Sequence, residues 1–147
     1  MRHASDRAVH RLGPASPAGR ALVGAQLRAN RPVTLIGVGG SMWPFIQPNT
    51  RVQLVPMTRP SVVGDIVLVD GFERLTLHRV VAIDPRGCVC TKGDTNPRVD
   101  GWVPPSAVLG HTRSRPWDAT VATLSLILGP CGLPWLRQVW RRTRRFR

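Results

Sequence analysis

One serine, one histidine and two aspartates are the side chains of this chain whose types and order suit acyl-transfer chemistry. Ser41 follows Gly39-Gly40, and glycines allow a tight turn from which a hydroxyl projects beside free backbone amides. Such amides stabilise the oxyanion that forms when a hydroxyl attacks a carbonyl. Taken alone, the motif is more typical of a plain turn, so Ser41 is a candidate nucleophile that needs a base.

The candidate general base is His78, in the strand-like stretch Leu77-His78-Arg79-Val80-Val81. A histidine among apolar neighbours is more often a structural residue. Neutral imidazole can nevertheless take a proton from a hydroxyl near neutral pH and return it to the leaving amine. The other three histidines, His3, His10 and His111, have no evident catalytic partner.

Two carboxylates follow His78 and are candidates to orient its imidazole. They are Asp94, in Thr91-Lys92-Gly93-Asp94, and Asp100, in Arg98-Val99-Asp100. A carboxylate that accepts the second imidazole N–H fixes the tautomer and stabilises the imidazolium. Gly-Asp pairs are also common in structural turns, and Asp65 fits that role. The residues leave open which of Asp94 and Asp100 orients the base.

Short strands separated by turns must position these side chains. The apolar and β-branched runs lie at Val33–Val38, Arg51–Val55, Asp65–Val69, Leu75–Ile83 and Cys88–Thr91. Ser16-Pro17 predicts the N-cap and first turn of a short helix that Pro32 ends. The sequence thus predicts a mostly β fold with four segments: a disordered start (1–14), a short helix (15–31), a β domain (32–115) and an apolar, arginine-rich C-terminal tail, helical or apolar (116–147).

The order of these segments resembles that of signal peptidase I and its relatives, a clan that also contains the self-cleaving domain of LexA-type repressors. Four ordered blocks over about 80 of the 147 residues carry the resemblance, and Val108-Leu109-Gly110 closes it. The blocks are Gly40-Ser41-Met42-Trp43-Pro44-Phe45-Ile46, Val63-Gly64-Asp65-Ile66-Val67, Leu77-His78-Arg79-Val80-Val81, and Thr91-Lys92-Gly93-Asp94-Thr95-Asn96 through Asp100.

The resemblance implies roles for the candidate residues. Ser41 matches the family's nucleophile, and His78 stands where bacterial relatives have a lysine base, as in the endoplasmic-reticulum and archaeal type. Asp100 matches a functionally important aspartate of that type, and Asp94 is the weaker candidate. Because Lys92 is the only lysine and lies in the later block, the resemblance implies a Ser-His mechanism.

Three departures from the family pattern loosen the link to bulk processing of secreted proteins. The sequence shows no N-terminal membrane anchor, and Asn49-Thr50 replaces the family's usual Gly-Asp. Gly39 replaces a serine that donates to the oxyanion in bacterial enzymes, so this task falls to backbone amides, including that of Ser41.

The function implied by the resemblance is a serine endopeptidase that cleaves a peptide or leader segment after small residues. A maturation peptidase acting on one peptide shares this chemistry. A catalytically silent binding module on the same scaffold is an alternative, and a LexA-like self-cleaving regulator is a less favoured one. Only about 30 residues precede the β region, too few for a DNA-binding domain and a cleavage loop.

The formal charge of +13 is almost entirely arginine and gathers at both ends of the chain. Such charge suits nucleic acid or an anionic membrane surface, but no nucleic-acid-binding motif accompanies it, which argues against nucleic acid. Residues 119–136 carry no charge and precede an arginine cluster. Glycines and prolines interrupt them, so a short buried element followed by a surface-lying basic helix at Trp135–Phe146 is favoured over a spanning helix. The compartment stays open between cytoplasmic and membrane-associated.

The cysteines predict no metal site. Cys88 and Cys90 lie two apart, which in a strand places both on one face and favours buried thiols. No second cysteine pair or neighbouring histidine completes a zinc site. We therefore expect neither a metal nor a cofactor.

Overall fold

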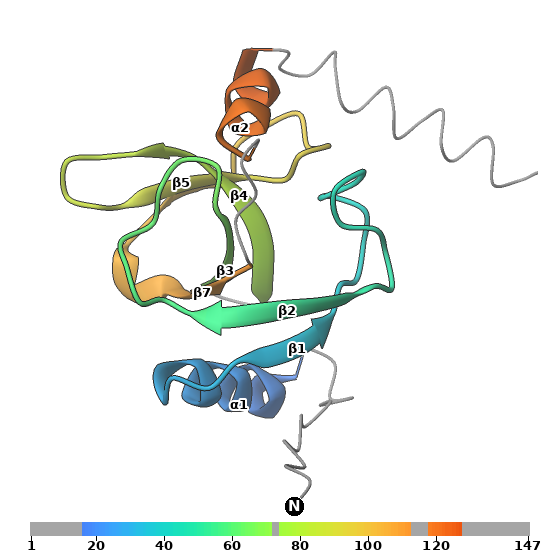
Figure 1. Cartoon of the computed structure of the whole chain (residues 1–147), viewed down its shortest axis with the longest axis vertical. Helices are drawn as coiled ribbons and strands as arrows, with labels where there is room; N and C mark the ends of the chain where they lie inside the picture. Colours follow the sequence, from blue (N-terminus) through green and yellow to red (C-terminus); the bar gives the residue numbers. More distant parts are fainter. Residues whose placement is uncertain (1–15, 72–73, 113–117, 128–147) are drawn as a thin grey trace, which may run out of the picture.

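The computed structural model describes residues 16–71, 74–112 and 118–127, and these form one seven-stranded antiparallel sheet with two α-helices and one short 3-10 helix (Figure 1). The strands are β1 (Val33–Ile36), β2 (Arg51–Pro56), β3 (Ile66–Asp70), β4 (Leu75–Ile83), β5 (Val89–Lys92), β6 (Gly101–Val103) and β7 (Val108–His111). The helices are α1 (Pro17–Arg28), the short 3-10 helix η1 (Pro105–Ala107) and α2 (Asp118–Ile127). The strand order is β1-β2-β7-β3-β4-β5-β6, and the predicted mostly β class is confirmed.

Helix α1 forms where the sequence predicts a short helix. The Ser16 hydroxyl accepts a hydrogen bond from the backbone N–H of Gly19 at 3.0 Å, and Pro17 occupies the first turn. The helix buries Val23 and Leu27 against the sheet. Figure 1 shows α1 lying beside β1 and β2 at one end of the molecule.

The central strand β3 supplies side chains to two hydrophobic clusters, because successive side chains of a strand point to opposite faces. Leu68 enters the cluster under α1, and Val67 and Val69 enter the second cluster. The first cluster contains Val23, Leu27, Val33, Leu35, Val52, Leu54, Leu68 and Leu109. The second contains Val67, Val69, Val80, Val89 and Val108. Both faces of β3 are therefore buried, which fixes the register of its neighbour β4.

Two strands were not among the five predicted runs. Strand β6 has only three residues, and its central Trp102 is 55% exposed. Strand β7 inserts between β2 and β3, which precede it by some 40 residues or more in the chain. Such short strands carry little local signal, and long-range pairing decides that they form.

Helix α2 occupies the first part of the segment predicted as a C-terminal tail. Its Ala122 is fully buried in a third cluster with Val81 and Cys90. None of the described helices has the length and apolar character needed to cross a membrane. The predicted disordered start and the predicted basic helix at Trp135–Phe146 lie outside the described residues.

The two described cysteines differ in their surroundings. Cys90 is buried on β5, and this burial raises the pKa of its thiol. Cys88 is half-buried and precedes the strand. Within the described ranges no three His, Cys, Asp or Glu side chains are placed to hold a metal ion.

Candidate active site

The loop that follows β1 presents Ser41. At its base, the N–H of Gly37 donates to the carbonyl of Thr50 at 2.9 Å, and the N–H of Asn49 donates to the carbonyl of Gly37 at 2.7 Å. Gly39 has φ +91°, a conformation that side-chain-bearing residues rarely adopt. This glycine turns the chain two residues before the candidate nucleophile.

Strand β4 carries His78 to the Ser41 hydroxyl. His78 lies opposite Val67 of β3 and is only 7% exposed. Its Nε2 is 3.0 Å from Ser41 Oγ, and its Nδ1 is 2.5 Å from Asp100 Oδ2. With Nδ1 protonated, the imidazole donates to Asp100 and accepts from Ser41. The structure thus joins the three residues in one hydrogen-bonded chain.

The Asp100 carboxylate is held by β5. The Thr91 hydroxyl donates to Asp100 Oδ2 at 2.9 Å, the same oxygen that faces His78. The backbone N–H of Asp100 also donates to the carbonyl of Thr91 at 2.8 Å. Nothing in the sequence around Thr91 indicates this role. Thr91 shares a face of β5 with Val89, and its contact with the site becomes evident only once the position of Asp100 is known.

Asp94, the other candidate carboxylate, bonds to Arg79 and not to His78. Arg79 Nε and a terminal nitrogen donate to the two Asp94 oxygens at 2.8 and 2.9 Å, and both side chains are fully buried. Burial raises the pKa of Asp94, and the guanidinium opposes this by stabilising the ionised carboxylate. Asp100 therefore contacts the candidate base His78, and Asp94 forms a buried ion pair with Arg79.

The Arg79–Asp94 pair also supports the loop that carries the candidate nucleophile, Ser41. The residue after Asp94, Thr95, donates from its backbone N–H to the carbonyl of Ser41 at 2.9 Å. The Arg79 guanidinium lies over the ring of Phe45, 5.1 Å from the ring centroid. The turn after β5 and the Ser41 loop are thereby fixed to the same buried cation.

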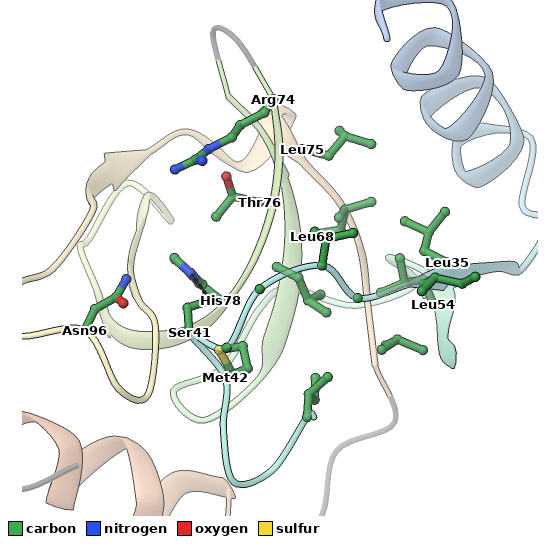
Figure 2. Close-up of a pocket in the computed structure, with 18 residues that line it drawn as sticks. Leu35, Ser41, Met42, Leu54, Leu68, Arg74, Leu75, Thr76, His78 and Asn96 are labelled. Atoms are coloured by element: carbon green, nitrogen blue, oxygen red, sulfur yellow. Dashed lines mark hydrogen bonds between the residues drawn. The ribbon is translucent and has the colours of Figure 1, made fainter. Parts of the chain in front are cut away.

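Gly93 leaves the space in which Asn96 and His78 approach each other. A Cβ at Gly93 would lie 2.7 Å from Asn96 Nδ2 and 3.0 Å from His78 Nε2. The Asn96 side chain lines the same cleft as Ser41, as Figure 2 shows. Asn96 belongs to one of the blocks that resemble signal peptidases, but the sequence indicates no role for it.

Backbone amides are available to stabilise an oxyanion. Among the described residues, the N–H of Ser41 donates to no other group.

Asp65, His111 and Lys92 are other polar residues of the sequence, and each is buried in the fold. Asp65 is 1% exposed, receives two 2.8 Å hydrogen bonds from Arg59 and accepts from the N–H of Val62, as a turn aspartate does. His111 is buried on β7, with Nδ1 2.7 Å from the carbonyl of Thr112. Burial lowers the pKa of Lys92, and the carboxylates of Asp94 and Asp100 oppose that shift.

Ser41 and His78 open into a cleft of about 550 Å³, a size typical of ligand sites. Its walls are mostly aliphatic and come from β1, β2, β3 and β4 (Figure 2). Two strand edges border it. β1 is an end strand of the sheet, and β4 pairs with β5 only from Arg79 onward, so its residues 75–78 pair with β3 alone among the described strands.

Comparisons of the chain with protein-family models, with curated proteins and with solved structures find no match.

Proposed function

We propose that this chain is a serine endopeptidase of the signal-peptidase type, acting on a peptide or on a leader segment of a protein. The observation that carries the proposal is the hydrogen-bonded chain from Ser41 through His78 to Asp100 at the edge of a peptide-sized cleft. Nucleophile, base and orienting carboxylate are the three groups that acyl transfer from a peptide requires.

In the proposed mechanism, Ser41 Oγ attacks the scissile carbonyl carbon while His78 Nε2 takes the hydroxyl proton. The oxyanion of the tetrahedral intermediate accepts a hydrogen bond from the Ser41 N–H. His78 then donates its proton to the leaving amine as the C–N bond breaks, which leaves an ester on Ser41. Water, deprotonated by His78, hydrolyses the ester and restores the hydroxyl. Asp100 stabilises the imidazolium at both steps.

The cleft supports an extended peptide as the substrate. The unpaired edges of β1 and of residues 75–78 offer backbone groups to a strand laid between them. Ile36 and Val38 of the cleft lining are 42% and 79% exposed, so they can contact apolar side chains of such a strand. The expectation that the chain cleaves after small residues is based on its resemblance to signal peptidases.

The test is digestion of a proteome-derived peptide library, with new termini identified by mass spectrometry. We expect cleavage by the wild-type chain. In Ser41→Ala and in His78→Ala the cleavage rate should fall by at least about a thousandfold, because each substitution removes a group that forms or breaks a bond in the reaction.

The matched control is Ser106→Ala, which removes an exposed serine hydroxyl from η1 and should leave cleavage unchanged. Equal cleavage by Ser41→Ala and wild type would eliminate Ser41 as the nucleophile. A wild-type chain that binds peptides, cleaves none and resists several serine-acylating reagents would instead be a silent binding module.

A further inference from the structure

Arg74 is the charged side chain at the end of the cleft remote from Ser41. Among the described residues that line the cleft, it is the one with a permanent charge, and no carboxylate is present in the lining. Figure 2 shows Arg74, Thr76 and His78 projecting from one side of the chain and Leu75 from the other. The alternation is that of an extended strand, so the arginine continues the row of polar groups that includes the catalytic base.

The turn that presents Arg74 is anchored from the opposite side of the sheet. Arg20 of α1 donates to Asp70 at 2.9 Å and to the carbonyl of Gly71 at 2.6 Å. The N–H of Gly71 in turn donates to the carbonyl of Arg74 at 3.2 Å. Arg20 thus engages the carboxylate at the end of β3.

The Arg74 side chain itself is exposed, and it makes no hydrogen bond or ion pair with another residue of the described ranges. A guanidinium presents several donors in a planar fork that matches a carboxylate. Its position at the mouth of an otherwise aliphatic cleft makes a carboxylate on the bound peptide its complement.

The spacing between Arg74 and His78 indicates how far from the scissile bond that carboxylate would lie. Arg74 precedes His78 by four residues, and an extended chain advances about 3.3 Å per residue, so the two side chains are about 13 Å apart along the strand. An extended substrate lying along β4 has the same repeat. We propose that Arg74 selects peptides with an Asp or Glu side chain about four residues from the scissile bond. This inference rests on the proposed peptidase function.

The experiment compares cleavage-site preferences of wild type, Arg74→Gln and Arg74→Glu on the same peptide library. For the wild type we expect Asp and Glu to be enriched about three- to fivefold at one position about four residues from the cleaved bond, the range for a partly exposed ion pair. Arg74→Gln should lose the enrichment, and Arg74→Glu should replace it with Lys and Arg.

The matched controls are Arg86→Gln and Arg86→Glu. Arg86 is an exposed arginine in the turn at the far end of β4, outside the cleft lining, so both controls make the same charge change and should keep the acidic preference. An acidic preference that persists in Arg74→Gln, or that is missing from the wild type, overturns the inference.

A binding measurement separates this inference from the peptidase proposal. The Ser41→Ala chain is titrated into short fluorescent Ala-Leu peptides in which one Glu is moved along the sequence. Position-dependent, Arg74-dependent binding supports acid recognition even if the wild type cleaves nothing, in which case only the peptidase proposal fails. Cleavage without Arg74-dependent preference leaves the peptidase proposal standing and overturns acid recognition.

Discussion

At the scale of single residues, two side chains of the site contact the same carboxylate oxygen. Asp100 Oδ2 faces His78 Nδ1 at 2.5 Å and accepts the Thr91 hydroxyl at 2.9 Å. Because the Asp100 side chain is 33% exposed, it would otherwise rotate toward solvent. In the proposed mechanism Thr91 acts through Asp100 on His78, as a positioning residue.

Thr91→Val should lower kcat about tenfold, which corresponds to one lost hydrogen bond to a charged group, and should leave KM nearly unchanged.

Asp100→Asn should lower kcat by about a thousandfold or more, because the amide no longer stabilises the imidazolium. Steady-state kinetics on a library-derived peptide measures both effects.

Thr91→Ser is the control for this prediction, since it keeps the hydroxyl and removes only a methyl group. It should recover most of the wild-type kcat. An equal loss of kcat in the valine and serine variants would contradict the positioning role and indicate a packing defect at β5.

At the scale of elements, successive side chains of β4 point to opposite faces of the strand and have different surroundings. His78 faces the cleft, and its neighbour Arg79 faces the interior, where it bonds Asp94 and the carbonyl of Gly64. The two candidate aspartates therefore meet opposite faces of one strand. This explains why Asp100 contacts the base while Asp94 supports the turn that holds the Ser41 loop.

Arg79→Met should lower the free energy of unfolding at pH 7 by about 3–5 kcal/mol, because it leaves the Asp94 carboxylate buried without its cation. Without the guanidinium, burial raises the pKa of Asp94 further. A carboxyl group whose folded-state pKa is raised stabilises the fold at low pH and loses that contribution as the pH rises. The deficit should therefore shrink between pH 7 and pH 5, as urea unfolding can measure.

Arg59→Met is the comparison for Arg79→Met. It also removes an arginine from a buried aspartate, Asp65, but Arg59 is 39% exposed, so water can replace it and the cost should be smaller. Adding Asp94→Leu to Arg79→Met should recover part of the lost stability. A deficit equal to that of Arg59→Met, or one independent of pH, would contradict a buried pair.

At the scale of the whole molecule, charge is the dominant feature outside the cleft. The net charge is +13, and six arginines lie in residues 137–147 with no acidic residue among them. An arginine-rich sequence of this kind attracts anionic lipid headgroups, and the attraction weakens as salt screens it. We propose an anionic membrane surface as a partner of this tail.

The full chain should bind vesicles that contain phosphatidylserine and leave neutral phosphatidylcholine vesicles unbound. Replacing the six arginines of residues 137–147 by glutamine should weaken vesicle binding by at least about a hundredfold, since each contributes about 1 kcal/mol near such a surface. Co-sedimentation at low and high salt measures this. Equal binding by the glutamine variant would move the membrane contact elsewhere on the chain.

The sequence by itself determined the elements with strong local signals. The Ser16-Pro17 cap starts α1, and the β-branched runs at residues 51–55 and 75–83 form β2 and β4. Glycines beside a serine and a histidine in a strand identified Ser41 and His78 as candidates. Each of these signals acts over a few neighbouring residues, as turn chemistry, capping and strand alternation do.

Tertiary structure alone decided the features that depend on distant residues. Ser41 and His78 are 37 positions apart, and His78 and Asp100 are 22 apart, so strand pairing and the long-range contacts of the Ser41 and Asp100 loops set their distances. The same pairing placed Asp94 on Arg79 and put Arg74 at the cleft. No local propensity specifies which face of a strand meets which turn; burial of the hydrophobic clusters on both sides of β3 fixes that register.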